Sequence, residues 1–229
     1  MNAANPTACL LVIGNEVLSG RTKDANINFL ATRLGEIGIP LREVRIIPDV
    51  RATIIDTLNE VRDSAFGVPW EPHPEAWARL ERHYRPGEFN AARQRMATMP
   101  RGAALIDNAI SIAPGFTMGN VHVLAGVPRI MQAMFEALAP TLEGGPPVAS
   151  RTVHADGVME GRIAEGLAAI QARWPGLDIG SYPYYRMGGG GVALVAKGQD
   201  ATAVAAAAQD ITVLLRAMGS HPAQGEPPV

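Results

Sequence analysis

The sequence contains little cysteine and no clustered positive charge. Cys9 is the one cysteine among 229 residues, which excludes an internal disulfide and fits a reducing, cytoplasmic environment. Lysine and arginine form no block, and the formal net charge is −2. Because proteins that bind nucleic acid without sequence preference carry a basic patch, we expect no nucleic-acid partner.

Long hydrophobic runs are also absent. The longest run near the start covers residues 8–13, and no positive charge precedes it. It is too short for a membrane span and lacks the basic start of a signal peptide, so we expect no membrane partner. Hydrophobic residues make up 47% and charged residues 18%, which is typical of a folded globular protein with a substantial core. We expect Cys9 to be a buried strand residue within that run.

The first sixty residues predict alternating strands and helices. The apolar run 8–13 ends at Gly14, which is typical of a strand buried on both faces of a parallel sheet. Apolar residues then recur at helical spacing from Ile27 to Ile37, and Gly38 follows the helix. Residues 41–47 predict a second strand, and Asp49 is placed to cap a helix over residues 54–61. We therefore expect an α/β fold, a three-layer and mostly parallel sheet.

A third parallel strand should follow, but residues 62–69 contain no apolar run long enough to cross a sheet. A helix begins instead near Pro74, which suits a first helical turn, and a short helical segment covers residues 90–96. Strand patterns return at residues 103–106 and 113–124, where Gly119-Asn120 predicts a tight hairpin turn. The helix after Pro128 carries two methionines, which we interpret as core residues.

The glycine- and proline-rich segment 144–150 predicts a linker after a first domain of residues 1–143. Residues 151–219 show the order βαββα and predict a small α+β module. We interpret the four glycines at 188–191 as a hairpin loop rather than a phosphate-binding loop. The tail, residues 220–229, is expected to be disordered.

The ends of the predicted strands indicate a ligand site, because ligands of parallel sheets bind beyond the carboxyl ends of the strands. The rule selects residues 14–26, residues 48–49 and residues 126–128. Glu16, Asp24 and Asp49 could together hold a hard cation such as Mg²⁺ or take up a proton. Asp24 and Asp49 each precede a helix, so capping would also explain them. The five histidines show no metal-ligand spacing, and the tyrosines at 182, 184 and 185 either stack on a base or alternate between core and surface.

Several segments, in order along the chain, resemble the molybdopterin-binding-domain family, in the branch of the CinA (competence/damage-inducible protein A) N-terminal domain. Residues 14–26, Gly-Asn-Glu-Val-Leu-Ser-Gly-Arg-Thr-Lys-Asp-Ala-Asn, resemble its opening motif, and residues 47–49, Ile-Pro-Asp, resemble its second-strand motif. Residues 100–103 and 113–116 are similar to its middle signature, and residues 125–128, Ala-Gly-Val-Pro, to a Pro-Gly-Val-Pro turn. Residues 165–167 and 180–183 resemble the domain that follows in this branch.

The resemblance implies that Asp49 lies in an active site and that the ligand is molybdopterin or a nucleotide pyrophosphate. It also implies a homo-oligomer and a divalent ion such as Mg²⁺, held by Glu16, Asp24 and Asp49. The ligand-binding positions that it implies are Gly14, Asn15, Glu16, Ser19, Gly20, Asp24, Asn26, Gly126 and Pro128.

One motif of the family is missing. Relatives have a Gly-Gly-x-Gly-Pro-Thr-x-Asp-Asp loop after the third strand, whose amides would hold phosphate and whose acids would bind the metal. Only four residues separate Val61 from Phe66, where a strand and this loop would need on the order of 25 residues. Three hypotheses follow: a metal-dependent nucleotide pyrophosphatase or transferase with impaired activity, a binding protein that does not turn its ligand over, or a degenerate copy that serves as an oligomeric scaffold or has no function.

Overall fold

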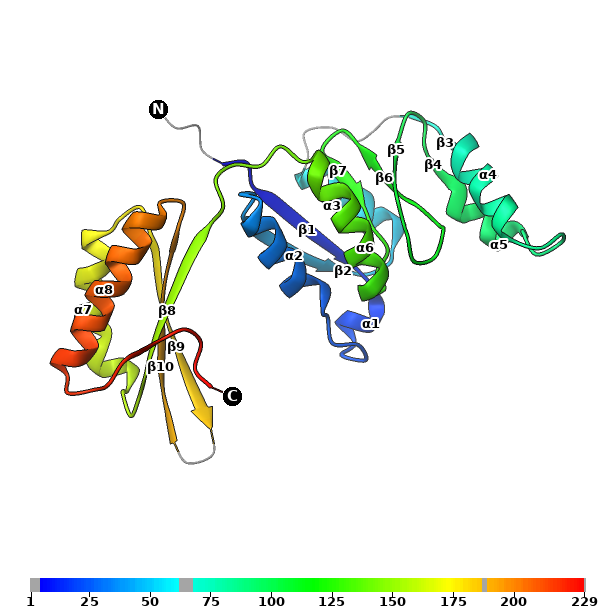
Figure 1. The fold of residues 1–229 in the computed structure, drawn as a ribbon. Coiled ribbons are helices and arrows are strands. Elements are labelled where there is room, and N and C mark those ends of the chain that lie inside the picture. Colours follow the sequence, from blue (N-terminus) through cyan, green and yellow to red (C-terminus); the bar gives the residue numbers. More distant parts are fainter. Residues whose placement is uncertain (1–4, 62–67, 187–188, 229) are drawn as a thin grey trace. The chain divides into compact units, whose positions relative to one another are not determined.

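A computed structural model describes residues 5–61, 68–186 and 189–228, so the predicted excision at residues 62–66 lies outside the described residues. The chain divides into two compact units (Figure 1). The first comprises Pro6–Leu34 and Pro40–Gly144, and the second comprises Met1–Asn5, Gly35–Ile39 and Gly145–Val229.

The first unit begins with the predicted strand, helix and strand. β1 (Ala8–Ile13) pairs in parallel with β2 (Leu41–Ile47), and α1 (Asn15–Leu18) and α2 (Asn26–Glu36) connect them. Gly38 follows α2 with a φ of 74°, the left-handed conformation that favours glycine after a helix. α3 (Arg51–Val61) comes next. Figure 1 shows α2 and α6 (Pro128–Leu138) in front of the two strands and α3 behind them, which makes three layers.

The α/β class is confirmed, but the parallel part is smaller than predicted. Among the described strands, β1 and β2 form the one parallel pair. The remaining strands of this unit form two antiparallel sheets. One pairs β3 (Trp70–Pro72) with β4 (Thr98–Pro100), and the other has the order β5 (Ala104–Ile106), β6 (Gly115–Met118) and β7 (Val121–Val123). No third parallel strand extends the sheet within the described residues. β5, β6 and β7 instead pair in chain order, and β3 pairs with β4 across the helices between them.

The helices that interrupt the α/β order begin as predicted. Pro74 occupies the first turn of α4 (Pro74–His83), and the His73 ring nitrogen Nδ1 accepts a hydrogen bond of 3.3 Å from the Ala76 N–H. α5 (Ala91–Gln94) and the 3₁₀ turn η1 (Arg95–Ala97) follow. Leu80 and Met99 are fully buried here, with Trp77 packed against them. These short elements therefore have a small core of their own.

The predicted hairpin turn and methionine core are confirmed. Gly119 and Asn120 join β6 to β7, and the φ of 59° at Gly119 fits glycine in the first central position of such a turn. Met131 and Met134 of α6 are 2% and 3% exposed. The 3₁₀ turn η2 (Ala139–Thr141) ends this part of the chain.

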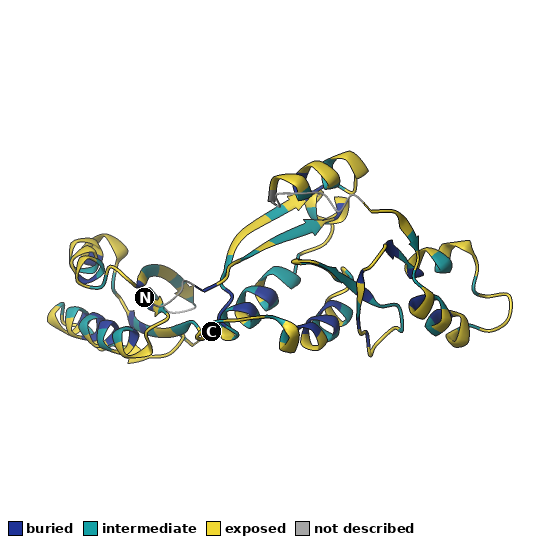
Figure 2. Ribbon diagram, turned by 90° about the horizontal axis from the view of Figure 1, so that it is seen from above, coloured by how far each residue is buried: buried dark blue, intermediate teal, exposed yellow. Residues whose placement is uncertain are grey.

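The two parallel strands are less buried than predicted. Ile13, Val44 and Ile46 are about two-fifths exposed, and Figure 2 shows little deep burial along this pair. The prediction of a buried Cys9 is wrong, because its side chain is exposed. Parallel strands are buried where other elements cover both faces of their sheet, and a sheet of two described strands offers little area for such cover. Partial desolvation and the nearby Glu43 carboxylate raise the pKa of the Cys9 thiol.

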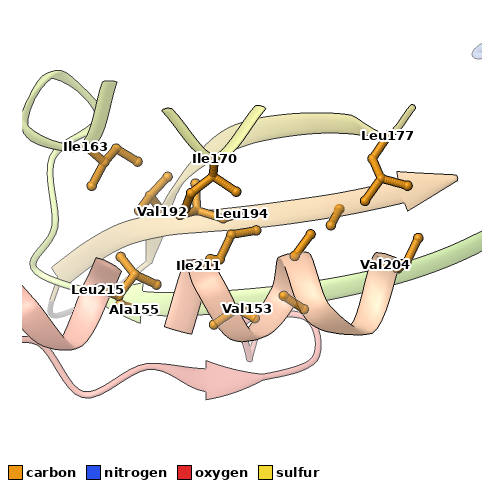
Figure 3. Close-up of a cluster of buried hydrophobic side chains, with 13 residues drawn as sticks. Val153, Ala155, Ile163, Ile170, Leu177, Val192, Leu194, Val204, Ile211 and Leu215 are labelled. Atoms are coloured by element: carbon orange, nitrogen blue, oxygen red, sulfur yellow. The ribbon is translucent and has the colours of Figure 1, made fainter. Parts of the chain in front are cut away.

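The second unit has the predicted order βαββα. It contains β8 (Ala149–Asp156), α7 (Glu160–Arg173), β9 (Asp178–Arg186), β10 (Gly189–Gly198) and α8 (Ala201–Ala217). β10 lies between β8 and β9 and is antiparallel to both. The core of the second unit lies between this sheet and the helices α7 and α8 (Figure 3). It includes the fully buried residues Ile163, Val192, Leu194, Ile211 and Leu215.

Part of the tail that was predicted to be disordered, residues 220–229, forms a short strand. β11 (Ala223–Gln224) pairs with β8 at the edge of the sheet. The Gly225 N–H donates to the Thr152 carbonyl at 2.9 Å, and the Thr152 hydroxyl donates to Glu226 Oε1 at 2.7 Å. The backbone of β8 provides hydrogen-bond partners for the tail, which the amino-acid composition of the tail does not reveal. None of the helices in the described part of the chain is long and apolar enough to cross a membrane.

Candidate functional site

The carboxyl ends of β1 and β2 lie side by side, as the sequence predicted. The Gly14 N–H, directly after β1, donates to the carbonyl of Ile47, the last residue of β2, at 3.1 Å. Pro48 and Asp49 continue from that point. The segments 14–26 and 48–49 therefore meet at one edge of the parallel pair, which we call the rim.

Glu16 folds back over Gly14. Gly14 is buried, and a Cβ placed on it would lie 2.5 Å from Glu16 Oε1. A larger residue at position 14 would therefore displace the carboxylate. The Glu16 carbonyl accepts from the Thr22 N–H at 3.1 Å and from the Ser19 hydroxyl at 3.2 Å, which fixes the loop around it. Glu16 is thereby held at the end of β1, with Asn15, Ser19 and Gly20 exposed beside it.

Asp24 has the structural role that the sequence left open. Its Oδ1 accepts a hydrogen bond of 2.8 Å from the Ile27 N–H in the first turn of α2. This bond satisfies one of the free amides at the helix start and places a negative charge there. An anionic ligand would compete with Asp24 for the same position, so this helix end is a poor phosphate site.

Asn26 connects two of the predicted segments. Its Nδ2 donates to the Gly126 carbonyl at 2.9 Å, across 100 positions of sequence. A carbonyl accepts only, so this bond fixes which side of the amide carries the N–H groups. The other atom, Oδ1, is buried and has no hydrogen-bond partner among the described residues. A buried acceptor without a donor costs about 1–3 kcal/mol, so this oxygen is a candidate ligand contact.

Asp49 and the segment after β7 complete the rim. Asp49 is exposed, and its carboxylate makes no hydrogen bond with any described residue. The helix cap predicted for it is not observed, because α3 begins two residues later, at Arg51. Gly126 is exposed, and Pro128 occupies the first turn of α6. Arg21 and Lys23, exposed cations in the loop before α2, were not among the predicted site residues.

The three carboxylates that were predicted to hold a metal ion are not grouped among the described residues. Within residues 5–61, 68–186 and 189–228, no three His, Cys, Asp or Glu side chains are arranged to hold one ion. Glu16, Asp24 and Asp49 therefore do not converge, and Asp24 is engaged in capping α2. Each carboxylate lies on a separate part of the loops at the strand ends, and no contact among the described residues brings the three together.

Two shallow cavities lie elsewhere. One of about 350 Å³ is lined by residues of β8, α8 and the tail, and one of about 330 Å³ lies beside Tyr84 and Phe89. Neither includes a predicted site residue.

Known proteins resemble both units. The family described as a probable molybdopterin binding domain matches residues 9–65, and the FAD synthase middle domain matches residues 147–223. A protein of Pyrobaculum calidifontis is 30% identical over 212 residues, covering 78% of this chain and 81% of the relative. A CinA-like protein of Parasynechococcus marenigrum is 28% identical over 243 residues, covering 90% of this chain and 57% of the relative.

The fold has a solved counterpart. A crystal structure of the protein CinA from Thermoplasma acidophilum superposes with a TM-score of 0.53 at 24% identity, covering 61% of this chain and 99% of that chain. The fold and the rim define an α/β protein with a molybdopterin-binding domain. The chain belongs to the CinA-like family. It spans about half the length of the CinA-like relatives from Parasynechococcus marenigrum and Thermosynechococcus vestitus, 57% and 49%.

Proposed function

We propose that this protein binds a pterin or a nucleotide at the rim and does not turn it over efficiently. The observation that carries the proposal is Asn26, whose amide joins α2 to the segment after β7 and whose Oδ1 is a buried acceptor without a described donor. The ring edge of a pterin and the exocyclic amine of a nucleobase both supply N–H donors. A phosphate oxygen cannot satisfy this atom, so the ring is the part of the ligand that Asn26 would meet.

Charge supports binding of an anionic ligand near the rim. Arg21 and Lys23 are exposed in the loop that leads to α2, where they would attract a phosphate-bearing molecule. Glu16 and Asp49 lie at the strand ends next to this loop and could accept hydrogen bonds from ring or ribose groups. The rim thus combines cations for attraction with acceptors for recognition.

Impaired turnover is supported by what the chain does not provide. The described residues do not fit a metal held by Glu16, Asp24 and Asp49, so no catalytic step is derived through one. The glycine-rich phosphate loop is not in the sequence. The match to the Parasynechococcus relative extends over 243 residues, more than the 229 of this chain, so the relative carries residues in the matched region that have no counterpart here.

The test is thermal unfolding with molybdopterin and with ADP-ribose, each with Mg²⁺ and with a chelator. A ligand at 100 times its dissociation constant adds about 2.7 kcal/mol. For the first unit this corresponds to a rise in Tm of about 8 °C. We expect a rise with one ligand that the chelator does not remove, and no release of AMP from ADP-ribose above the rate without protein.

Asn26→Leu separates this site from non-specific stabilisation. Removing the amide should weaken binding by about 10- to 100-fold, the equivalent of a lost hydrogen bond to a buried partner. Asn28→Leu is the matched control, because Asn28 is exposed on the same helix. Equal binding by both variants, or no ligand that shifts the transition, would refute the proposed site. Mg²⁺-dependent AMP release would refute the impairment.

A further inference from the structure

The sheet of the second unit has a second face, opposite its core. The core cluster takes Val192 and Leu194 from the central strand β10, on the side where α7 and α8 pack (Figure 3). Because successive side chains of a strand alternate between the two faces, Ala193 points to the other side. Its direct partners on the neighbouring strands, Tyr182 of β9 and His154 of β8, lie on that side with it. We call this side the outer face, and its side chains include Tyr182, Tyr184, Arg186, His154 and Asp156.

The ring of Tyr182 leans along its own strand, over Gly180. A Cβ placed on Gly180 would lie 3.1 Å from the ring atom Cε2 and 3.1 Å from the hydroxyl oxygen of Tyr182. Because glycine has no side chain, the far end of the ring can approach the sheet closely at this point. Tyr182 is still 58% exposed. The residue therefore offers a large part of an aromatic ring to solvent while the sheet supports it from below.

Hydrogen bonds fix the two neighbouring rings. The Tyr184 hydroxyl donates to Asp156 Oδ1 at 2.6 Å, and the Arg186 guanidinium binds the same carboxylate. His154 meets Tyr184 edge to face, with ring centroids 6.3 Å apart. His154 Nδ1 lies 2.8 Å from the Gly225 carbonyl oxygen, and a carbonyl only accepts, so Nδ1 is the donor. In the neutral imidazole, Nε2 is then an acceptor.

Ala193 shows that these rings form a layer over the sheet. It is 4% exposed although it lies outside the core cluster, and it sits directly between Tyr182 and His154. Side chains of the outer face therefore cover it. Aromatic rings prefer stacked or edge-to-face contacts with other rings. A flat ring can stack on this layer at low entropic cost, because two of its rings are already held in place.

The charges of the outer face are matched. Arg186 binds Asp156, and Lys197 lies directly opposite Asp178 on the paired strands β10 and β9. Proteins that bind single-stranded nucleic acid combine stacking rings with a positively charged groove that follows the phosphates. In the described part of this face each cation has an acid beside it, so a chain of phosphates is not favoured. The charge balance instead suits a single neutral ring.

We propose that the outer face binds the base of one purine nucleoside or mononucleotide, stacked on Tyr182. Every nucleobase has an aromatic face for such stacking, and a purine has the larger one. The exocyclic amine of the base supplies a donor for Nε2 of His154. Tyr182 and Tyr184, for which the sequence allowed either base stacking or core packing, both lie outside the core cluster. The proposal is independent of the ligand bound at the rim.

Titration of the intact chain with adenosine, followed by two-dimensional NMR, tests the site. We expect the amide signals of Gly180, Tyr182 and Ala193 to shift. Tyr182→Ala should weaken the binding of adenosine by about 5- to 100-fold, the usual effect of removing a ring on which a base stacks. Tyr182→Phe should retain most of the affinity, because the ring remains. Tyr185→Ala is the matched control, because Tyr185 is 91% exposed on the same strand but points to the opposite face.

Two further ligands and one variant separate the alternatives. AMP should bind with an affinity similar to that of adenosine, and single-stranded oligoadenylate should gain nothing from its additional phosphates. Asn26→Leu should leave the shifts at Gly180 and Ala193 unchanged, so a failure of the rim site is distinguishable from a failure of this one. The proposal would be overturned by the absence of these shifts or by equal weakening in Tyr182→Ala and Tyr185→Ala. Salt-sensitive binding of oligoadenylate that is far tighter than that of AMP would overturn it as well.

Discussion

Gly191 is the position where a single added methyl group should do most damage to the second unit. It lies in β10 directly opposite Asp156 of β8 and Tyr184 of β9. The Tyr184 hydroxyl reaches over it to donate to Asp156 Oδ1 at 2.6 Å, and the Arg186 guanidinium binds the same carboxylate. A Cβ on Gly191 would lie 2.1 Å from the Ala155 carbonyl oxygen and 2.8 Å from the Tyr184 hydroxyl oxygen.

Gly191→Ala must therefore separate β10 from β8 and displace the Tyr184 ring. Overpacking of this kind costs about 1–3 kcal/mol. Loss of the partly exposed hydrogen bond from Tyr184 to Asp156 adds about 1 kcal/mol. A total of about 3 kcal/mol should lower the Tm of the second unit by about 15 °C, since a unit of this size loses about 4–8 °C per kcal/mol.

Differential scanning calorimetry measures the effect, and the ultraviolet absorbance of tyrosinate reports on Tyr184. Burial and the Asp156 carboxylate raise the pKa of Tyr184 to about 12, and the variant should bring this pKa back toward 10. Gly161→Ala is the control, because it lies in the first turn of α7 with open space around it. It should stabilise the unit by about 0.5–1 kcal/mol. If Gly191→Ala melts within about 2 °C of the wild type, the steric reasoning is wrong.

Three further changes have defined outcomes. Tyr184→Phe should remove a pH dependence of the free energy of unfolding. The raised pKa of Tyr184 contributes stability that is complete below pH 10 and lost as pH rises through about 12. In urea unfolding, the free energies of wild type and variant should therefore converge over that range, and a constant difference would contradict the reasoning. Asp24→Ala should lower the free energy of unfolding by about 1 kcal/mol in urea titrations, whereas Asp24→Ser should retain most of the cap on α2; equal losses would argue against capping. Deleting residues 221–229 should speed amide hydrogen exchange at Thr152 more than at Leu194, because β11 covers the edge strand and not the centre; unchanged exchange at Thr152 would show that β11 contributes no protection.

Much of the architecture could be predicted because it is encoded locally. The runs of apolar residues in β1, β2 and β8–β10 and the helical spacing in α2, α6 and α8 depend on neighbours within a few positions. Gly38 and Gly119 marked a helix end and a turn because only glycine adopts their backbone conformations easily. The pairing of β11 with β8 could not be predicted this way, since Ala223 and Gln224 have no strand-like pattern and depend on an edge 71 positions earlier in sequence.

The candidate site was only partly predictable for the same reason. The sequence placed Gly14, Glu16 and Asp49 correctly at adjacent strand ends, because parallel strands bring their carboxyl ends together. Whether the carboxylates converge depends on loop paths, and these direct Asp24 to the amide of Ile27 instead. The contact of Asn26 with Gly126 is a tertiary one, and no spacing in the sequence distinguishes it from an ordinary helix start. Exposure of Cys9 likewise depends on how much of its sheet other elements cover rather than on its own strand.

The sheet of the second unit is built only from residues 149–224, and its buried cluster from residues 153–215. Its central strand β10 and the edge strand β11 both pair with β8 across stretches of sequence at least as long as the one that separates β1 from β2. During synthesis the ribosome releases β1 first, and β1 has no partner until the α2 crossover and β2 have followed. β1 is thus exposed for the longest time in the life of a nascent chain, which makes this strand the part of the protein where a chaperone has most to protect.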